Sequence, residues 1–278
     1  MVLREYLIKT GQYLIKKSMF TRKIFIVGSP VNENGSFQSG IKADVINYNR
    51  YFQSAIGGAF DSDNEITILK NPGWKYLKAK LITSKADFTI FIFSGHGFFA
   101  TNTEKMVFNI NADDAVAVQT IIDNIQSPKK LIISDSCQSY MEGYHYFEGI
   151  DNVEKYMSFR SSIAKPRARQ LFNDAIKNSP NGTQILMSCS RGQESVLTQT
   201  GSFFSYALLT SSQHWSNINT SDSVLTALEV GKMTTTFLKR NYTSGQTTQR
   251  PSYLVTELKP NFPIGVKHTY TSLECSGI

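Results

Sequence analysis

The chain has 278 residues, of which 41% are hydrophobic, 18% charged and 12% aromatic. This composition is typical of a globular protein and excludes the collagen-like, disordered and disulfide-stapled classes. Lysine and arginine outnumber aspartate and glutamate by 29 to 22, which gives a net charge of +7. Because neither an arginine-rich tract nor zinc-finger spacing accompanies this charge, we expect no nucleic-acid partner.

The three cysteines, Cys137, Cys189 and Cys275, are widely spaced and form no Cys-x-x-Cys pair, which fits a reducing compartment. No apolar run approaches the roughly 20 residues that cross a bilayer, so we expect no membrane span. Charges interrupt the apolar residues of the leader, residues 1–21, unlike those of a secretory signal. We therefore expect a cytoplasmic protein. The leader is either an amphipathic surface helix or, because Gly11 interrupts it, a helix or hairpin packed on the domain.

Short apolar runs alternate with segments of helical spacing along the chain. The predicted strands are Lys23–Gly28, Glu65–Leu69, Asp87–Phe93, Lys130–Ile133, Gln184–Met187 and Pro251–Val255. The predicted helices are Ile41–Phe52, Trp74–Ser84, Asp113 or Asp114 to Ile125, Arg167–Ile176, Ser202–Thr210 and Ser223–Arg240. This alternation predicts an α/β fold with a mainly parallel, roughly six-stranded sheet, helices on both faces, and reactive groups at the carboxyl ends of the strands. The long polar segment from residue 138 to about 165 is a candidate regulatory or processing loop.

His96 and Cys137 come directly after the third and fourth predicted strands, and glycines flank His96 on both sides. Neighbouring parallel strands lie about 4.8 Å apart and end at the same edge of a sheet, so we expect the two side chains to meet there. An imidazole that takes the proton of a thiol, or stabilises the thiolate as imidazolium, makes the sulfur a nucleophile for a carbonyl carbon. The amides of Gly97 and Cys137 are the candidate oxyanion hole.

Taken singly, each of these residues has a simpler interpretation. A cysteine after an apolar strand is usually a small buried hydrophobe, and a lone histidine is usually structural. The pair favours catalysis, because His96 and Cys137 both stand at strand ends and are 41 residues apart in the chain.

The two motifs resemble those of the caspase-like cysteine peptidases. Phe93-Ser94-Gly95-His96-Gly97 and Asp135-Ser136-Cys137-Gln138-Ser139 are most similar to the metacaspase branch. Supporting similarities lie at Asp44, Met187 to Ser195, Gly201 to Leu209 and Gln249 to Pro251, so the resemblance covers roughly residues 22–256. It implies a caspase-like three-layer α/β/α sandwich over residues 22–278, with a large-subunit-like part (22–140), a linker loop (141–166) and a small-subunit-like part (167–278).

The resemblance also implies a specificity. In metacaspases and paracaspases the acid two residues before the cysteine lines the specificity pocket and favours cleavage after arginine or lysine, and Asp135 occupies that position. A charge-assisted pair between a buried carboxylate and a guanidinium explains such a preference. The alternative is that Asp135 caps the following turn. Ser188 and Glu194 are further substrate-binding candidates, Glu194 because Arg191-Gly192 stands where metacaspases carry a second pocket acid.

Lys165, Arg167 and Arg169 lie where relatives with a processed linker are cut, and they are candidate autoprocessing positions. The alternative is that they are solvated residues at the start of a helix.

Many metacaspases bind calcium through aspartates, and Asp113 and Asp114 occupy the corresponding place. Calcium prefers six to eight oxygen ligands, whereas the stretch from Gly97 to Asn111 contains only Glu104 as an acid. Helix capping is therefore the favoured interpretation of these two aspartates. The thiol chemistry itself requires no cofactor.

We predict a cysteine endopeptidase of the caspase or metacaspase type that acts on proteins and cleaves after arginine or lysine. The resemblance implies a regulatory protease of cell-death or defence pathways, with an activating or inhibiting protein partner. One alternative is a catalytically silent scaffold that binds a protein partner, against which the retention of both His96 and Cys137 argues. A second is a nucleotide-binding domain, but the loop from Gly28 to Gly35 is neither a P-loop nor Gly-x-Gly-x-x-Gly.

Overall fold

A central sheet of six strands organises the chain. The computed structural model describes residues 20–29, 35–140, 156–218, 223–241 and 249–267. The strand order is β12-β8-β7-β3-β1-β2, and every neighbouring pair is parallel except the pair of β12 with β8. The strands are β1 (Arg22–Ser29), β2 (Ile66–Lys70), β3 (Phe88–Gly95), β7 (Lys129–Asp135), β8 (Gly182–Met187) and β12 (Ser252–Val255). The prediction of a mainly parallel, six-stranded sheet is confirmed.

Side chains of the central strands alternate between two buried clusters. On β1, Ile24 and Ile26 belong to one cluster, and Phe25 and Val27 to the other. Because both faces of the sheet are covered, the middle positions of its central strands are apolar. The same alternation places Ile90, Ile92, Leu131 and Ile133 in the first cluster and Phe91, Phe93 and Ile132 in the second.

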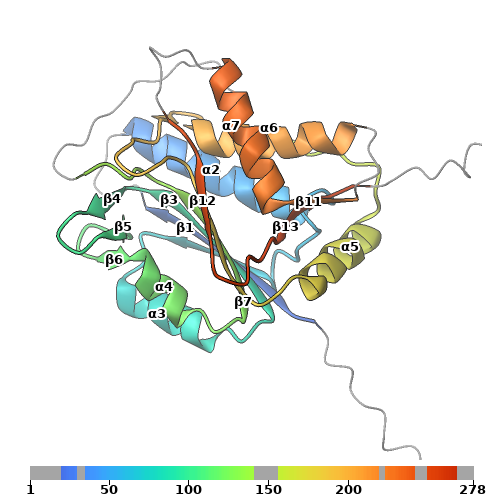
Figure 1. Cartoon of the computed structure of the whole chain (residues 1–278), viewed down its shortest axis with the longest axis horizontal. Coiled ribbons are helices and arrows are strands. Elements are labelled where there is room, and N and C mark those ends of the chain that lie inside the picture. Colours follow the sequence, from blue (N-terminus) through green and yellow to red (C-terminus); the bar gives the residue numbers. More distant parts are fainter. Residues whose placement is uncertain (1–19, 30–34, 141–155, 219–222, 242–248, 268–278) are drawn as a thin grey trace, which may run out of the picture.

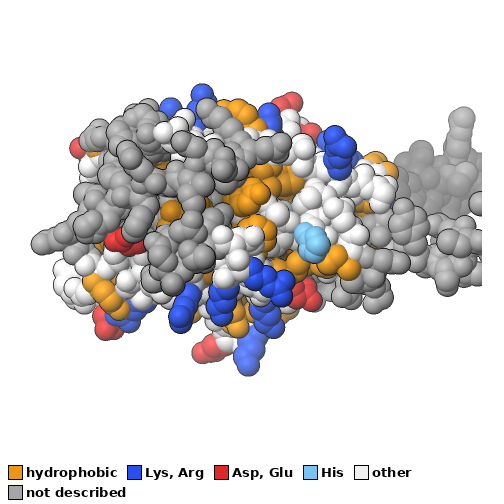
Figure 2. All heavy atoms as spheres, turned by 90° about the horizontal axis from the view of Figure 1, so that it is seen from above, with side chains coloured by type: hydrophobic (Ala, Val, Ile, Leu, Met, Phe, Trp, Pro, Cys, Tyr) orange, Lys and Arg blue, Asp and Glu red, His pale blue; other side chains and the backbone are white. Residues whose placement is uncertain are grey.

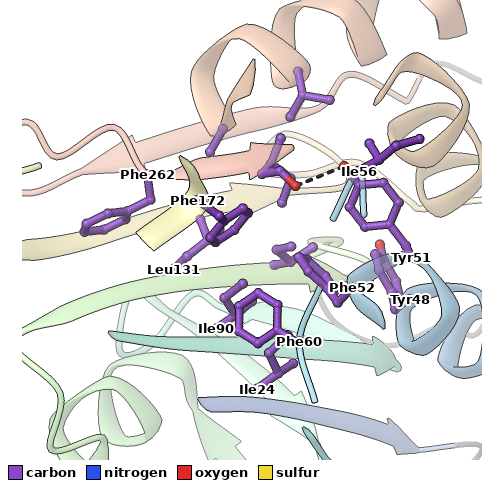
Figure 3. Close-up of a cluster of buried hydrophobic side chains, with 14 of the residues drawn as sticks. Ile24, Tyr48, Tyr51, Phe52, Ile56, Phe60, Ile90, Leu131, Phe172 and Phe262 are labelled. Carbon is purple, nitrogen blue, oxygen red and sulfur yellow. Dashed lines mark hydrogen bonds between the residues drawn. The ribbon is translucent and has the colours of Figure 1, made fainter. Parts of the chain in front are cut away.

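Helices cover both faces of the sheet, as Figure 1 shows. The helices on one face are α3 (Trp74–Thr83) and α4 (Val118–Asn124), and those on the other are α2 (Gly35–Gln53), α5 (Lys165–Asn178), α6 (Phe203–Asn217) and α7 (Ala227–Asn241). The aromatic side chains of α2 fill the larger cluster, where Tyr48, Tyr51 and Phe52 lie over Ile24 and Ile90 (Figure 3). The three-layer α/β/α arrangement is therefore confirmed.

Three small antiparallel sheets were not predicted. The first follows His96 and consists of β4 (Gly97–Ala100), β5 (Lys105–Asn109) and β6 (Ala115–Ala117). The others pair β9 (Leu197–Thr198) with β10 (Gly201–Ser202) and β11 (Val224–Thr226) with β13 (Pro263–Val266). Four of these strands, β6, β9, β10 and β11, have only two or three residues, which is too short for a hydrophobic period to reveal them.

The predicted helix from Asp113 or Asp114 to Ile125 is wrong at its start. Residues 115–117 form β6, and α4 begins only at Val118. The Asp114 carboxylate accepts the Trp74 amide at 2.8 Å, so it caps α3, which lies 40 residues earlier in the chain. Similarly, α7 begins at Ala227 because β11 occupies the first residues of the predicted helix Ser223–Arg240.

The structure describes only parts of the predicted leader and linker. Residues 1–19 of the leader and residues 141–155 of the linker lie outside the described residues. Helix α5 begins at Lys165, two residues before its predicted start, so the last two residues of the predicted linker 141–166 are helical.

Within the described ranges no helix is long and apolar enough to cross a membrane. On the side that carries α6 and α7, shown in Figure 2, lysine and arginine are more abundant than aspartate and glutamate, in agreement with the net charge of +7.

A buried ion-pair network lies at the opposite end of the sheet from His96 and Cys137. Arg22, whose side chain is fully buried, donates from Nε to Glu65 at 3.0 Å and stacks on Phe60 at 3.7 Å from the ring centroid. Arg169 of α5 donates to both oxygens of the same carboxylate, at 2.8 and 2.6 Å. A pocket of about 650 Å³ opens beside this network at the amino-terminal ends of β1 and β2.

Replacement of Glu65 by glutamine tests the network. The variant leaves the Arg22 charge buried without a counter-ion, so we expect the free energy of unfolding to fall by about 3 kcal/mol. Urea denaturation measures this difference. The control is Asp174→Asn, which removes the exposed pair with Lys177 and changes stability by less than about 0.5 kcal/mol. Equal effects of the two variants would contradict the assignment.

Candidate active site

The register between β3 and β7 brings His96 and Cys137 to one edge of the sheet. Ser94 pairs with Asp135 in this parallel ladder, and His96 and Cys137 each follow two residues later. Both residues are half-buried. The predicted placement of these two residues at neighbouring strand ends therefore agrees with the topology.

The glycines around His96 allow two chain segments to approach closely. A Cβ atom on residue 97 would lie 2.7 Å from Ser136 Oγ and 3.0 Å from the carbonyl oxygen of Cys137. A Cβ atom on residue 95 would lie 2.8 Å from the carbonyl oxygen of Ser29. At both positions the approach is too close for a larger residue, so glycine is required on each side of His96. The backbone after β3 consequently packs directly on the turn that carries the cysteine.

Backbone groups of the segment after β8 surround the Cys137 thiol. The Ser195 amide donates to Sγ at 3.3 Å, and the Ser195 carbonyl oxygen lies 3.7 Å from it. Burial is the largest effect on this thiol and, with the nearby charges of Glu194 and Asp135, raises its pKa to about 11. The thiol is therefore protonated at neutral pH in the resting chain and needs a base to become a nucleophile.

A pair of buried acids lies beneath Cys137. Asp135 is 4% exposed and Asp44, on α2, is fully buried. Ser202 connects them, because its amide donates to Asp44 Oδ1 at 2.9 Å and its hydroxyl to Asp135 Oδ2 at 2.5 Å. Ser195 joins this cluster to the nucleophile, since its hydroxyl lies 3.5 Å from Asp135 Oδ1 while its amide binds Sγ.

Desolvation raises the pKa of both acids. It raises the pKa of Asp44 to about 6, although hydrogen bonds from Ser205, Ser202 and Ser94 oppose the shift. For Asp135, burial and then the charge of Asp44 raise the pKa well above its usual range. Among the described residues no cation forms a salt bridge with either carboxylate. The two acids are thus buried without a neutralising cation, which favours their protonated, neutral forms.

The two further substrate-binding candidates, Ser188 and Glu194, differ in burial and in their contacts. Ser188 is fully buried, and its hydroxyl donates to the Ser136 carbonyl at 2.9 Å and accepts the Ser136 amide at 3.2 Å. Ser188 therefore supports the turn that carries Cys137, and its contact with substrate stays a prediction. Glu194 is half-buried, and its charge acts on the thiol.

The calcium candidates Asp113 and Asp114 differ in their contacts. Asp114 accepts hydrogen bonds from the Trp74 amide and the Asn111 side chain, which lower its pKa, while Asp113 is exposed. The described part of the chain contains no group of three or more histidine, cysteine, aspartate or glutamate side chains arranged to hold a metal.

The autoprocessing candidates lie in the first turns of α5. Lys165 and Arg167 are exposed, whereas Arg169 is bound to Glu65 by two hydrogen bonds. All three are therefore helical in this structure, in keeping with the alternative interpretation of residues at a helix start.

Asp44 and the segment Gly201 to Leu209 belong to the resemblance, but no site role was predicted for Asp44 or for the serines around it. The available signal was an acid between Ala43 and Val45 within the predicted helix Ile41–Phe52. Its hydrogen-bond partners Ser202 and Ser205 lie about 160 residues away, so only the fold shows that they meet.

The raised pKa of Asp44 predicts a pH dependence of stability. The folded chain keeps a proton on Asp44 that the unfolded chain loses between about pH 4 and 6, so stability falls as the pH rises through that window. We expect wild type to lose on the order of 3 kcal/mol more than Asp44→Asn across the window. Urea unfolding at pH 4, 5 and 6 measures it, with Asp174→Asn as the control that retains the wild-type slope. Identical slopes in wild type and Asp44→Asn would refute the assignment.

Comparisons with known proteins agree with this fold. The model of the caspase domain family matches residues 38–263. No curated protein sequence matches the chain. Solved structures similar to it include caspase-1 of Spodoptera frugiperda (14% identity, TM-score 0.51, covering 91% of this chain and 92% of that one) and the Drosophila initiator caspase Dronc (12%, 0.50, 88% and 84%).

A protein of Geobacter sulfurreducens is similar to the same extent (14% identity, TM-score 0.53, covering 89% of this chain and all of that one). At these identities the likeness concerns the fold. Together with a family model that spans most of the sequence, it shows that the chain belongs to the caspase domain family, whose members are cysteine peptidases.

Proposed function

We propose that this chain is an active cysteine endopeptidase that cleaves proteins after arginine or lysine through His96 and Cys137. The observation that carries the proposal is the β3–β7 register, which ends neighbouring parallel strands just before these two residues. A thiol and an imidazole at adjacent strand ends are the two groups that acyl transfer through a thioester requires.

In the proposed reaction, His96 accepts the proton of the Cys137 thiol as the sulfur attacks the peptide carbonyl. The amides of Gly97 and Cys137 donate to the oxyanion of the tetrahedral intermediate. The C–N bond breaks as His96 returns the proton to the leaving amine. Water activated by His96 then hydrolyses the thioester. The elevated pKa of the resting thiol supports the need for such a base.

The buried acids support a preference for a basic side chain before the scissile bond. Asp135 and Asp44 share Ser202 and lie on the same side of the sheet edge as Cys137. A guanidinium or ammonium group between them would relieve the unfavourable burial of two carboxylates, with charge-assisted hydrogen bonds. The role of Glu194 in substrate binding remains part of this proposal.

The second candidate is a catalytically silent scaffold that binds a protein partner through the same edge. The high pKa and the backbone cover of Cys137 favour it, because they describe an unreactive thiol at rest. The presence of both His96 and Cys137 favours the peptidase.

Within the peptidase proposal, the similarity of the two motifs to those of the metacaspases supports a protein of the metacaspase type. We propose a regulatory protease of cell death or defence that works in the cytoplasm, acts on protein substrates under an activating or inhibiting partner, and needs no cofactor. The capping contact of Asp114 argues against a calcium requirement.

Cleavage of fluorogenic peptides tests the function. We expect wild type to cleave peptides with arginine or lysine before the reporter, and not those with aspartate or leucine. Cys137→Ala should lose at least 1,000-fold in kcat/KM, and His96→Ala between about 100- and 10,000-fold, as expected for loss of a nucleophile and of a general base.

Circular dichroism and urea denaturation of each variant show that it is folded. Cleavage after aspartate would contradict the assignment of the acid pair. Absence of cleavage by wild type, with and without calcium or cell extract, together with retained folding would favour the scaffold.

Self-processing is a separate prediction. Arg169 is held by Glu65, so we expect cleavage at Lys165 or Arg167 and not at Arg169. Mass spectrometry of incubated wild type should find these fragments, which Cys137→Ala and the double variant Lys165→Ala/Arg167→Ala lack. Arg169→Ala should leave the fragments unchanged, and a cut after Arg169 in wild type would refute the prediction.

A further inference from the structure

The segment from Cys189 to Ser195 lies directly over the nucleophile. The amide of Gln138, the residue after Cys137, donates to the Gln193 carbonyl at 2.9 Å, and the Gly192 amide donates to the Gln138 carbonyl at 2.8 Å. These two backbone hydrogen bonds and the bond from the Ser195 amide to Cys137 Sγ hold residues 189–195, the covering segment, against the cysteine turn.

Arg191 connects the covering segment to two aromatic side chains, Phe99 and Tyr140. Its guanidinium carbon lies 3.8 Å from the ring centroid of Phe99 and 5.9 Å from that of Tyr140. The two rings meet edge to face at 6.0 Å. An aromatic ring attracts a cation over its face, so this arrangement is favourable. The only acid paired with Arg191 among the described ion pairs is Glu104, at 3.8 Å, and both side chains are at least half exposed, so this pair adds little.

Two local features adapt the chain to this contact. Gly192 has φ +79°, and a Cβ atom there would lie 2.6 Å from Tyr140 Cε2, so a larger residue does not fit. Phe99 lies in β4, three residues after His96, and its amide donates to the Ser139 carbonyl at 3.0 Å. The aromatic pair therefore joins the chain after His96 to the chain after Cys137, and Arg191 adds the covering segment to both.

We propose that Arg191 is a positioning residue that clamps the covering segment onto Phe99 and Tyr140 and thereby shields the Cys137 thiol in the resting chain. The proposal rests on the proposed function only in taking Cys137 as the nucleophile. Arg191 occupies the place where the resembled family carries a pocket acid, so its side chain is a feature of this chain and not of the motif.

The chemistry of the thiol reports on the clamp. Burial is the largest cause of the raised pKa of Cys137 and outweighs the opposing hydrogen bond from Ser195. When the covering segment moves away, hydration of the sulfur increases and its pKa falls. Each unit by which the pKa falls raises the thiolate fraction at neutral pH tenfold.

The experiment measures alkylation of Cys137 by iodoacetamide in the full chain between pH 6 and 10. Peptide mass spectrometry separates this adduct from adducts at the other two cysteines. We expect Arg191→Ala to react at least threefold faster than wild type at pH 7.5, with a lower apparent pKa. Arg191→Lys keeps the cation and should restore much of the wild-type behaviour.

Two further variants identify the cause. Phe99→Leu keeps an apolar side chain but removes the ring, so it should reproduce the effect, and adding Arg191→Ala to it should cause little further change. Arg250→Ala is the matched control, because this exposed arginine contacts Ser190 and Gln193 through its backbone. It should behave as wild type.

The outcomes separate this inference from the proposed function. An Arg191→Ala rate equal to or below that of wild type, or an equal rise in Arg250→Ala, overturns the clamp whether or not the protein cleaves peptides. Faster alkylation in Arg191→Ala without any peptide cleavage by wild type supports the clamp and counts against the peptidase.

Discussion

The parallel register between β3 and β7 is the constraint on which the site depends. It ends two neighbouring strands at the same level, and His96 and Cys137 follow directly after those ends. The register is itself determined by burial, because a slip of one residue would exchange the two faces and move Ile90 and Leu131 out of the larger cluster. The packing of the sheet therefore determines where His96 and Cys137 lie relative to each other.

Burial also sets the chemical character of the site. Removal from water raises the pKa of the thiol and of both carboxylates, so the resting site favours the neutral forms of all three groups. The shift for Asp44 persists despite three hydrogen bonds that favour the carboxylate. Entry of a positively charged side chain would reverse this balance at the acid pair. Binding of a positively charged ligand would therefore be coupled to loss of protons from the two acids.

The sequence was sufficient to predict the six strands and the edge at which His96 and Cys137 lie. These features depend on near-continuous apolar runs, which a single sequence displays directly. The sequence was insufficient where partners are remote. The capping of α3 by Asp114 spans 40 residues, and the acid pair depends on Ser202, far along the chain from Asp44. No local pattern encodes such contacts.

The ion-pair network around Glu65 would help to hold the chain together after a break in its backbone. Glu65 joins Arg22 of β1 to Arg169 of α5, while β7 pairs along its length with β8. These contacts connect the chain before residue 141 with the chain after residue 155. Severing the backbone between those positions would consequently yield a tightly associated heterodimer of fragments, which gel filtration would not resolve without denaturant.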